Sequence, residues 1–162
     1  MDMLIVGMRG NGHVGLNGCN DTQYLQHFAM WAFFGSPLII GGDVRNMDVE
    51  SEKTLLNPGL ISINRDEEAR PPFCVSVKDG IYIFFRLLSG NKFAIAAFGI
   101  PELGEKGAAA AVSFEDCGIH SEANLSVSIT DAITGEKLGI FKDGISIRVC
   151  ENGSKVLIGE II

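Results

Sequence analysis

The sequence predicts an α/β segment followed by an all-β antiparallel sandwich. Its 162 residues are 46 % hydrophobic and 20 % charged, which is typical of a globular protein. Short apolar runs alternate with a helical pattern up to residue 64, and an alternating period-two pattern begins at residue 73. The charged, proline-ending stretch 65–72 (RDEEARPP) separates the two patterns. We therefore expect an α/β part over 1–66, a linker over 67–72 and a sandwich over 73–162.

The α/β part begins with two short apolar runs that flank one helix. Met3–Gly7 (MLIVG) and Pro37–Gly41 (PLIIG) are continuous runs, as in parallel strands buried on both faces. The pattern predicts a helix over Asp21–Phe34, capped by Asn20 or Asp21 and ended by Gly35. Its apolar residues nearly encircle the last two turns, so we expect neighbours on more than one side.

Two shorter elements follow the second apolar run. Asp48 is positioned to open a short helix that reaches Leu56. The triplet Asn57-Pro58-Gly59 interrupts the chain before a further turn over Leu60–Asn64. The order is strand, loop, helix, strand, loop, helix, which is typical of a parallel sheet. Two such units cannot close a sheet, and a (β/α)₈ barrel takes about 250 residues. We therefore expect this part to be the end of a larger α/β domain.

The second part alternates apolar and polar residues in short runs separated by turn residues, which predicts antiparallel strands. The predicted strands are Phe73–Val77, Ile81–Leu87, Lys92–Ala97, Ala110–Phe114, Leu125–Thr130, Lys137–Phe141, Ile145–Val149 and Lys155–Gly159. The Asp-Gly pairs at Asp79 and at Asp143 are hairpin signals.

Composition excludes several classes of function. The net charge of −7 argues against a nucleic-acid or anionic-membrane partner. No apolar run approaches the roughly 20 residues of a membrane helix, and the start lacks the basic region of a secretory signal. The four cysteines form no C-x-x-C pair, so we expect no metal site and no cofactor. We expect reduced thiols in a cytoplasmic protein, although two disulfides in a secreted protein are the alternative.

A glycine motif follows the first apolar run. Gly10, Gly12 and Gly15 match G-x-G-x-x-G, a dinucleotide-binding pattern. In that fold the third glycine opens the helix that holds the pyrophosphate. Here the predicted helix begins only at Asp21, and no acid-ended second strand follows about 20 residues on. A flexible loop is therefore the favoured interpretation over a nicotinamide-dependent oxidoreductase.

Few other residues suggest chemistry on their own. Asp43 and Arg45 follow the second apolar run and would lie on the functional side of a barrel, where strands end. A lone Asp after Gly-Gly is more often a turn or cap residue. His27 lies between apolar neighbours, which favours a partly buried structural histidine.

A long, specific pattern carries a family resemblance. The run His27–Met47 (HFAMWAFFGSPLIIGGDVRNM) and the run Leu55–Asp66 (LLNPGLISINRD) resemble segments of the α-galactosidases of glycoside hydrolase families 27 and 36. In that family HFSLWALMAAPLLIGNDLRNM leads into LLNKEVIAINQD. The opening Asp2-Met3-Leu4 resembles the family's N-D-P-D-M-L-x-V-G. The match spans about residues 2–66, and the β half fits the family's C-terminal domain by order and character.

The resemblance implies the last two βα units of a (β/α)₈ barrel followed by an antiparallel sandwich. It also implies that Asp2 and Met3 are substrate-binding residues that line the sugar pocket. The family's nucleophile follows a K-x-D pattern on an earlier strand, and its acid/base follows R-x-x-x-D; this sequence has neither. Retaining hydrolysis needs both carboxyl groups. We therefore expect no catalytic residue here and no activity of this chain alone.

Two functions follow as hypotheses. The first is the C-terminal portion of an α-galactosidase-like hydrolase that removes terminal α-galactosyl groups when complete. The alternative is a non-catalytic sandwich module for carbohydrate or partner binding; Tyr82, Phe84, Phe85, Phe93 and Phe98 are, however, expected to be core. The expected partners are α-galactosides in the complete enzyme, and other copies of this chain or a complementary barrel segment. Such association would use the strand edges and the Phe28–Phe34 face.

Overall fold

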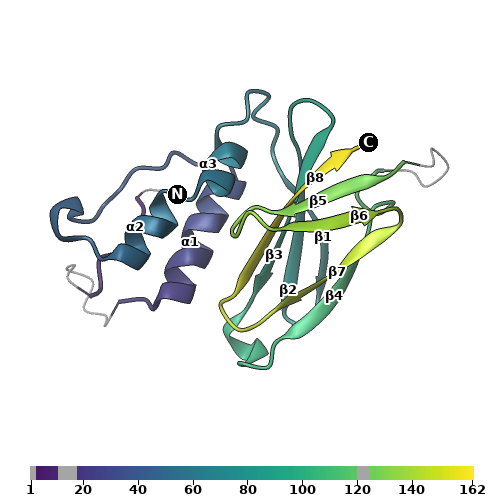
Figure 1. Ribbon diagram of the computed structural model, residues 1–162. Helices are drawn as coiled ribbons and strands as arrows, with labels where there is room; N and C mark the ends of the chain where they lie inside the picture. Colours follow the sequence, from purple (N-terminus) through teal and green to yellow (C-terminus); the bar gives the residue numbers. More distant parts are fainter. Residues whose placement is uncertain (1–2, 11–17, 120–124) are drawn as a thin grey trace.

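Helices cover one face of an antiparallel β-structure in the computed structural model, which describes residues 3–10, 18–119 and 125–162 (Figure 1). The helical elements are α1 (Asp21–Phe33), the 3-10 helix η1 (Val44–Asn46), α2 (Val49–Leu55), α3 (Pro58–Asn64) and the 3-10 helix η2 (Pro101–Leu103). The strands are β1 (Phe73–Lys78), β2 (Ile81–Leu87), β3 (Lys92–Gly99), β4 (Ala108–Ser113), β5 (Val127–Asp131), β6 (Lys137–Phe141), β7 (Gly144–Val149) and β8 (Ser154–Ile161).

Helix α1 forms as the sequence predicts and ends one residue earlier. The Asn20 side chain accepts a hydrogen bond from the backbone N–H of Gln23 at 2.9 Å, and the Gln23 side chain accepts one from the backbone N–H of Asn20 at 3.0 Å. This reciprocal capping box satisfies two N–H groups that the helix itself leaves free. Gly35 follows the helix with φ of +68°, a conformation that glycine adopts without steric cost.

The two apolar runs of the α/β part do not form the doubly buried strands that we expected. They meet in one parallel bridge, Leu4 to Ile40, in which Leu4 N donates to Ile39 O at 2.7 Å and Gly41 N donates to Leu4 O at 2.9 Å. Leu4 and Val6 are fully buried toward the helices, whereas Met3 is 49 % and Ile39 55 % exposed. The prediction was wrong for that second face because none of the described residues covers it.

Helices α2 and α3 follow this pair of segments. The Asp48 side chain caps α2, as predicted. The turn expected over Leu60–Asn64 is instead a full helix that starts at Pro58, with Asn57 as its cap. Proline fits the first position of a helix because the N–H that it lacks would be unpaired there. The triplet that suggested an interruption is therefore a helix start.

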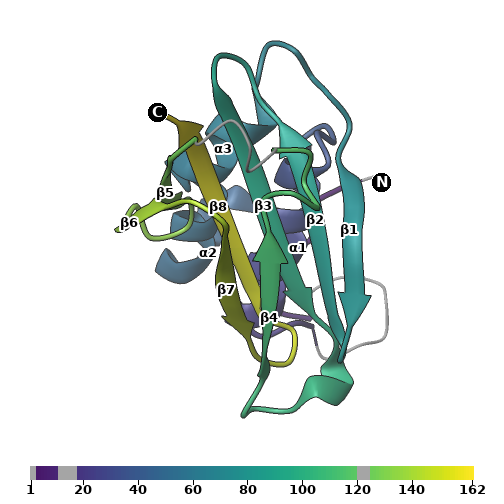
Figure 2. The same cartoon turned by 90° about the vertical axis from the view of Figure 1, so that its right-hand side faces the viewer.

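Within the described residues, eight strands form two antiparallel sheets. The six-stranded sheet has the order β1-β2-β3-β8-β5-β6, and β4 pairs with β7 in a separate two-stranded sheet. All eight match the predicted strands to within two residues at each end. Figure 2 shows the β4-β7 ribbon in front of the larger sheet and the helices behind it. The antiparallel β-structure of the second part is thereby confirmed.

The two Asp-Gly signals behave differently. Asp79 and Gly80 have φ of +51° and +77° and join the paired strands β1 and β2 in a tight hairpin. The pair Asp143-Gly144 does not close a hairpin, because β6 pairs with β5 while β7 pairs with β4. That turn instead carries the chain from one sheet to the other, so the hairpin expected there was wrong.

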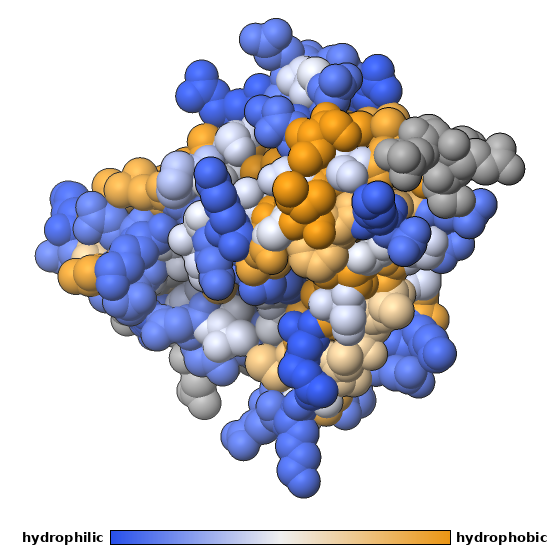
Figure 3. Space-filling model, turned by 45° about the vertical axis from the view of Figure 1, so that its right-hand side comes forward, coloured by the Kyte–Doolittle hydropathy of each residue, from blue (hydrophilic) through white to orange (hydrophobic). Residues whose placement is uncertain are grey.

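The larger sheet is buried on both faces. One core lies between the two sheets and includes Ile83, Phe85 and Phe93. The other lies between the larger sheet and the helices, where Phe28 and Phe33 of α1 are at most 1 % exposed. The expectation that the Phe28–Phe34 face needs an outside partner is therefore corrected, since this face packs largely on the chain's own sheet. Hydrophilic residues dominate the helical half in Figure 3, and apolar ones gather over the sheets.

Polar side chains also tie the helices to the sheet. The Gln26 amide of α1 donates to Gly99 O at 2.9 Å and to Gly153 O at 3.0 Å. The Asn57 amide donates to Ile133 O at 2.8 Å, just after β5. These contacts place α1 and α3 against backbone carbonyls of the β-structure. The helices and the sheet therefore share one packed unit, while the division into 1–66, 67–72 and 73–162 stays a prediction.

Gly59 in α3 provides a test of this packing. A Cβ at this position would lie 2.0 Å from the carbonyl oxygen of Ala132, which follows β5. We expect Gly59→Ala to push α3 away from the sheet and to lower the free energy of unfolding by about 1–3 kcal/mol, as overpacking does. Thermal unfolding measures this, with Ser62→Ala on the exposed side of the same helix as the control. Equal melting temperatures for both variants would contradict the close approach.

Candidate functional site

The candidate site lies where the two bridged segments end. After Gly7 the chain turns through Arg9, and after Gly41 it turns through Asp43. Because Leu4 and Ile40 pair in parallel, these two turns emerge on the same side. In open or closed parallel sheets, the carboxyl ends of strands are the usual place for ligands. The residues around these two turns are therefore the candidates for ligand binding or catalysis.

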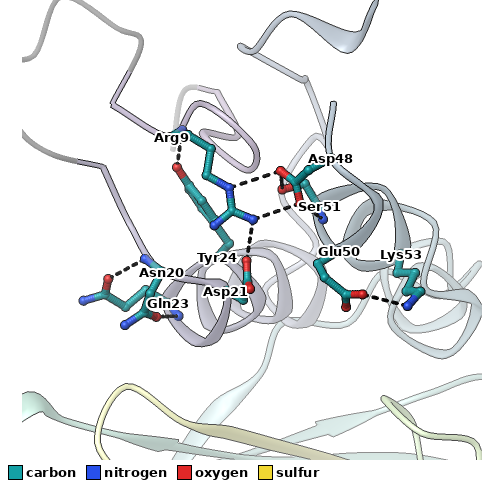
Figure 4. Close-up of polar contacts among 9 residues, drawn as sticks. All are labelled: Arg9, Asn20, Asp21, Gln23, Tyr24, Asp48, Glu50, Ser51 and Lys53. Carbon is teal, nitrogen blue, oxygen red and sulfur yellow. Dashed lines mark hydrogen bonds and ion pairs between the residues drawn. The ribbon is translucent and has the colours of Figure 1, made fainter. Parts of the chain in front are cut away.

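Arg9 joins three segments at this end (Figure 4). Its guanidinium donates to Asp48 at 3.1 and 2.9 Å and also to Asp21 at the start of α1. It lies over the Tyr24 ring, 5.2 Å from the centroid, and the Arg9 backbone N–H donates to the Tyr24 hydroxyl at 2.7 Å. Planar guanidinium groups suit such paired carboxylate contacts. The arrangement fixes the turn and the starts of α1 and α2 relative to one another.

Both carboxylates of this cluster are paired with the one guanidinium of Arg9. Arg9 holds the pKa of the Asp48 carboxyl far below its usual range, helped by hydrogen bonds from Ser51. The same carboxylates raise the pKa of Arg9. A general acid or base needs a pKa near the working pH. Asp48 is therefore a structural carboxylate that caps α2. Sequence reasoning missed this cluster because the partners of Arg9 lie 12 to 39 residues from it along the chain.

His27 has a structural role that the sequence only partly indicated. Its Nε2 accepts a hydrogen bond from the Ile5 backbone N–H at 3.2 Å. The ring also packs on Trp31, with centroids 4.0 Å apart. Burial lowers the pKa of His27 below its ordinary 6.5. A nitrogen that accepts a hydrogen bond carries no proton, so the geometry and the lowered pKa agree. The imidazole of His27 therefore pairs with the backbone N–H of Ile5 in the first segment.

Asp43 and Arg45 pair with each other. The Asp43 carboxylate caps η1 by accepting from the Arg45 backbone N–H at 3.0 Å, and the Arg45 side chain donates back at 2.8 and 2.7 Å. These bonds lower the pKa of Asp43. The cap interpretation of Asp43 is thereby confirmed. The Arg45 side chain is 83 % exposed, which leaves the pair at the surface of the site.

Of the two residues expected to bind sugar, Asp2 and Met3, the structure describes only Met3. Asp2 lies outside the described residues, as do Gly12 and Gly15 of the glycine motif. Met3 lies on the uncovered face of the bridged segments, which we call the open face and define by Met3, Ile5 and Ile39. Gly41 makes room for Met3, because a Cβ on Gly41 would come 3.2 Å from the Met3 Cβ. The roles of Asp2 and Met3 stay predictions.

Other kinds of site find little support in the parts of the chain that the structure describes. The four cysteines, all described, are free thiols, and burial raises the pKa of Cys117 to about 12. No three His, Cys, Asp or Glu side chains among the described residues gather as metal ligands. No described helix is long and apolar enough to cross a membrane.

An apolar groove of about 390 Å³ lies between α1 and the larger sheet. Tyr82 and Phe84 of β2 line it, together with Gln26 and Met30 of α1. Tyr82 is 40 % exposed, so the expectation that all the sheet aromatics are core was wrong for this residue. Phe85 and Phe93 are buried as expected.

Comparisons with known proteins show what this chain is similar to. The family model described as Alpha galactosidase A matches residues 1–66. The α-galactosidase of Coffea arabica is 30 % identical over 145 residues, covering 90 % of this chain and 37 % of the coffee protein. The crystal structure of α-galactosidase I from Mortierella vinacea matches with a TM-score of 0.78 at 26 % identity, covering 91 % of this chain and 37 % of that one.

A third match is stronger in structure. A candidate α-galactosidase/melibiase of Bacteroides fragilis matches with a TM-score of 0.84 at 29 % identity, covering 97 % of this chain and 33 % of that one. The chain is similar to the C-terminal part of family 27 α-galactosidases. It spans about a third of the length of these relatives. The resemblance predicted from the sequence is thereby confirmed, and it extends across the helices and the sheets.

His27 gives a pH-dependent prediction for this chain. Because its pKa is lowered on folding, the unfolded chain binds a proton at a higher pH than the folded chain does. Stability should therefore fall as the pH drops below about 6.5, toward the lower pKa of the folded state. Denaturant unfolding between pH 7.5 and 5 measures this loss.

Two variants isolate that effect. His27→Gln keeps an acceptor for Ile5 N–H and should reduce the loss between pH 7.5 and 5. His27→Phe removes the acceptor of that partly exposed N–H and should lower stability by about 0.5–1.5 kcal/mol at neutral pH, with no further loss on acidification. An imidazole pKa at or above 6.5 in an NMR titration of the folded chain would refute the assignment.

Proposed function

We propose that this chain is the C-terminal portion of a retaining glycoside hydrolase that removes terminal α-galactosyl groups when complete. The proposal extends to the whole protein what the relatives' names state about them, α-galactosidase activity. We further propose that residues 1–66 are the last two βα units of a (β/α)₈ barrel. The single observation that carries this is the parallel Leu4–Ile40 bridge with helices on one face and an apolar open face on the other.

The open face supports a barrel in physical terms. In a barrel, strand residues alternate between the outer helices and the packed interior. Leu4 and Val6 contact the helices here, and Met3, Ile5 and Ile39 point the other way. Apolar side chains of this size gain about 1.5–3 kcal/mol each on burial. A face of this kind is suited to the interior of a barrel that other strands complete.

The proposed sugar pocket lies on the open face, beside Met3 and Gly41. Asp2 and Met3 are proposed to line it from the start of the first segment, with Met3 held against Gly41. Asp43 and Asp48, which lie where the bridged segments end, are held by Arg45 and Arg9, and these contacts lower the pKa of each carboxyl. The nucleophile and the acid/base are proposed to come from the remaining strands. We also propose a cytoplasmic location, which the four free thiols support.

Activity should depend on completing the barrel. We expect this chain alone to leave an aryl α-galactoside intact, because it lacks both catalytic carboxylates. Joining it behind the part of the Coffea arabica enzyme that lies outside the match should restore hydrolysis. In that joined protein, Asp2→Asn should lower kcat/KM by about 10- to 100-fold, as loss of a charge-assisted hydrogen bond does. Turnover by the chain alone that disappears in Asp2→Ala would refute the proposal.

The alternative of a carbohydrate-binding module rests on one observation, the exposed Tyr82 in the apolar groove. Sugar-binding faces usually present several exposed aromatic rings, and Phe98 in this groove is only 4 % exposed. We therefore expect galactose and melibiose to leave the Tyr82 and Phe84 resonances unchanged in an NMR titration. Saturable shifts that vanish in Tyr82→Ala, but persist in the control Phe73→Ala, would favour the binding module instead.

A further inference from the structure

Helix α3 is held at both ends by asparagine side chains. At its start, the Asn57 side chain accepts a hydrogen bond from the Leu60 backbone N–H at 3.0 Å, and its amide nitrogen donates to Ile133 O at 2.8 Å. At its end, the Asn64 amide donates to Ser36 O at 2.9 Å. The first contact reaches the turn after β5, and the second reaches the chain just before the second of the two bridged segments. Helix α3 therefore connects the β-structure to that segment.

The turn that receives Asn57 is fixed by a buried carboxylate. Asp131 is 1 % exposed and accepts hydrogen bonds from the backbone N–H groups of Ile133 at 2.8 Å and of Thr134 at 3.1 Å. It also forms an ion pair with Lys155 of β8. A buried charge that is both paired and hydrogen-bonded makes its surroundings rigid. The Ile133 carbonyl is therefore a fixed anchor for α3.

Helix α3 is too short to hold its position without such anchors. It has seven residues, whereas isolated helices shorter than about 12–15 residues are marginal in water. Its buried side chains, Leu60 and Ile63, determine which face of the helix points inward. The two asparagines determine where the helix lies along its own axis. Because Asn57 both caps the helix and docks it, the start of α3 and its attachment to the sheet form together.

The far end of α3 lies next to the bridge between the two segments. From Ser36 the chain runs on to Ile39 and Gly41, whose backbone groups bond to Leu4. So short a pairing specifies its register weakly, and a slip by one residue would exchange the two faces of a segment. Such a slip would turn Met3 from the open face toward the helices. Whatever fixes the chain at Ser36 therefore also fixes the side on which Met3 lies.

We propose that α3 is a rigid spacer through which the β-structure sets the register of the bridged segments, with Asn57 and Asn64 as positioning residues for Met3. The inference rests on the proposed function, in which Met3 lines the sugar pocket. It gives the β-structure an influence on the shape of that pocket, although the contact between them runs through a helix.

Hydrogen exchange of the Gly41 amide in this chain measures the bridge directly, because Gly41 N donates to Leu4 O. Asn57→Asp keeps the acceptor for Leu60 N–H but removes the donor to the turn after β5. It should speed the exchange of Gly41 about 5- to 10-fold, the factor that loss of one hydrogen bond gives. Asn64→Asp should have an effect of similar size. The double variant should exchange no faster than the faster single variant, because releasing either end already frees the spacer.

Two control variants separate positioning from loss of stability. Asn20→Asp makes the same substitution at the cap of α1, where the side-chain oxygen bonds to Gln23 of its own helix. Ile147→Val removes one methyl group from the core between the two sheets, away from α3. Both variants should leave the exchange of Gly41 unchanged. An increase in either control equal to that in Asn57→Asp would show that Gly41 reports only overall stability, and would overturn the inference.

Activity supplies the second readout. In the protein joined behind the remaining part of the Coffea arabica enzyme, Asn57→Asp should raise KM for an aryl α-galactoside about 3- to 10-fold, because Met3 is displaced. Ile147→Val should leave KM unchanged. An unchanged KM in Asn57→Asp, additive effects in the double variant, or a Gly41 amide that exchanges freely in the unaltered chain would each overturn the inference. A joined protein that does not cleave the substrate would refute the proposed function, while the exchange results would still decide the role of α3.

Discussion

The arrangement of the whole chain depends on how Arg86 of β2 fixes the end of α1. Its side chain is 1 % exposed and donates to Phe33 O at 2.8 Å and to Ala32 O at 3.4 Å. A buried cation costs several kcal/mol unless it is bonded, and the end of a helix offers unpaired carbonyls and a favourable dipole. Burial lowers the pKa of Arg86, and the Asp66 carboxylate opposes that shift. Gly35 leaves room, since a Cβ there would lie 3.4 Å from Nη1.

Fixing the end of α1 determines what each side of the helix can contact. One side packs on Ala94, Ala96 and Phe98 of the larger sheet, while Leu4 and Val6 complete the same core. The chain leaves the helix through Gly35 and runs directly into the segment that pairs with Leu4. The helix layer therefore lies between the sheet and the bridged segments. The face of those segments that points away from the helices is left for contacts beyond the described residues.

The β half was predictable from the sequence because turn residues separate short strands, and some of these strands, such as β5, alternate buried and half-buried residues. Strand β3 does not alternate, because it is buried on both faces. Asp143-Gly144 misled us, since a turn signal gives no information on which strands pair. The buried pattern of Met3–Gly7 also misled us. A continuous apolar run is typical of a strand that other elements cover on both faces. The run itself does not show whether the rest of the chain supplies those elements, and here only the helix side is covered. The start of α3 at Pro58 was missed because Asn-Pro-Gly equally suits a turn and a helix cap.

The candidate site was less predictable than the fold, and the reason is distance along the chain. The Arg9 cluster and the His27 contact with Ile5 join residues that no short motif links. Only the family resemblance indicated Met3, and the structure places it against Gly41 on the open face. In the proposed barrel, a pocket that has Met3 on one wall takes its other walls from strands across the barrel axis. On the proposed function, the segment therefore supplies one pocket-lining side chain, while the nucleophile and the acid/base come from the remaining strands.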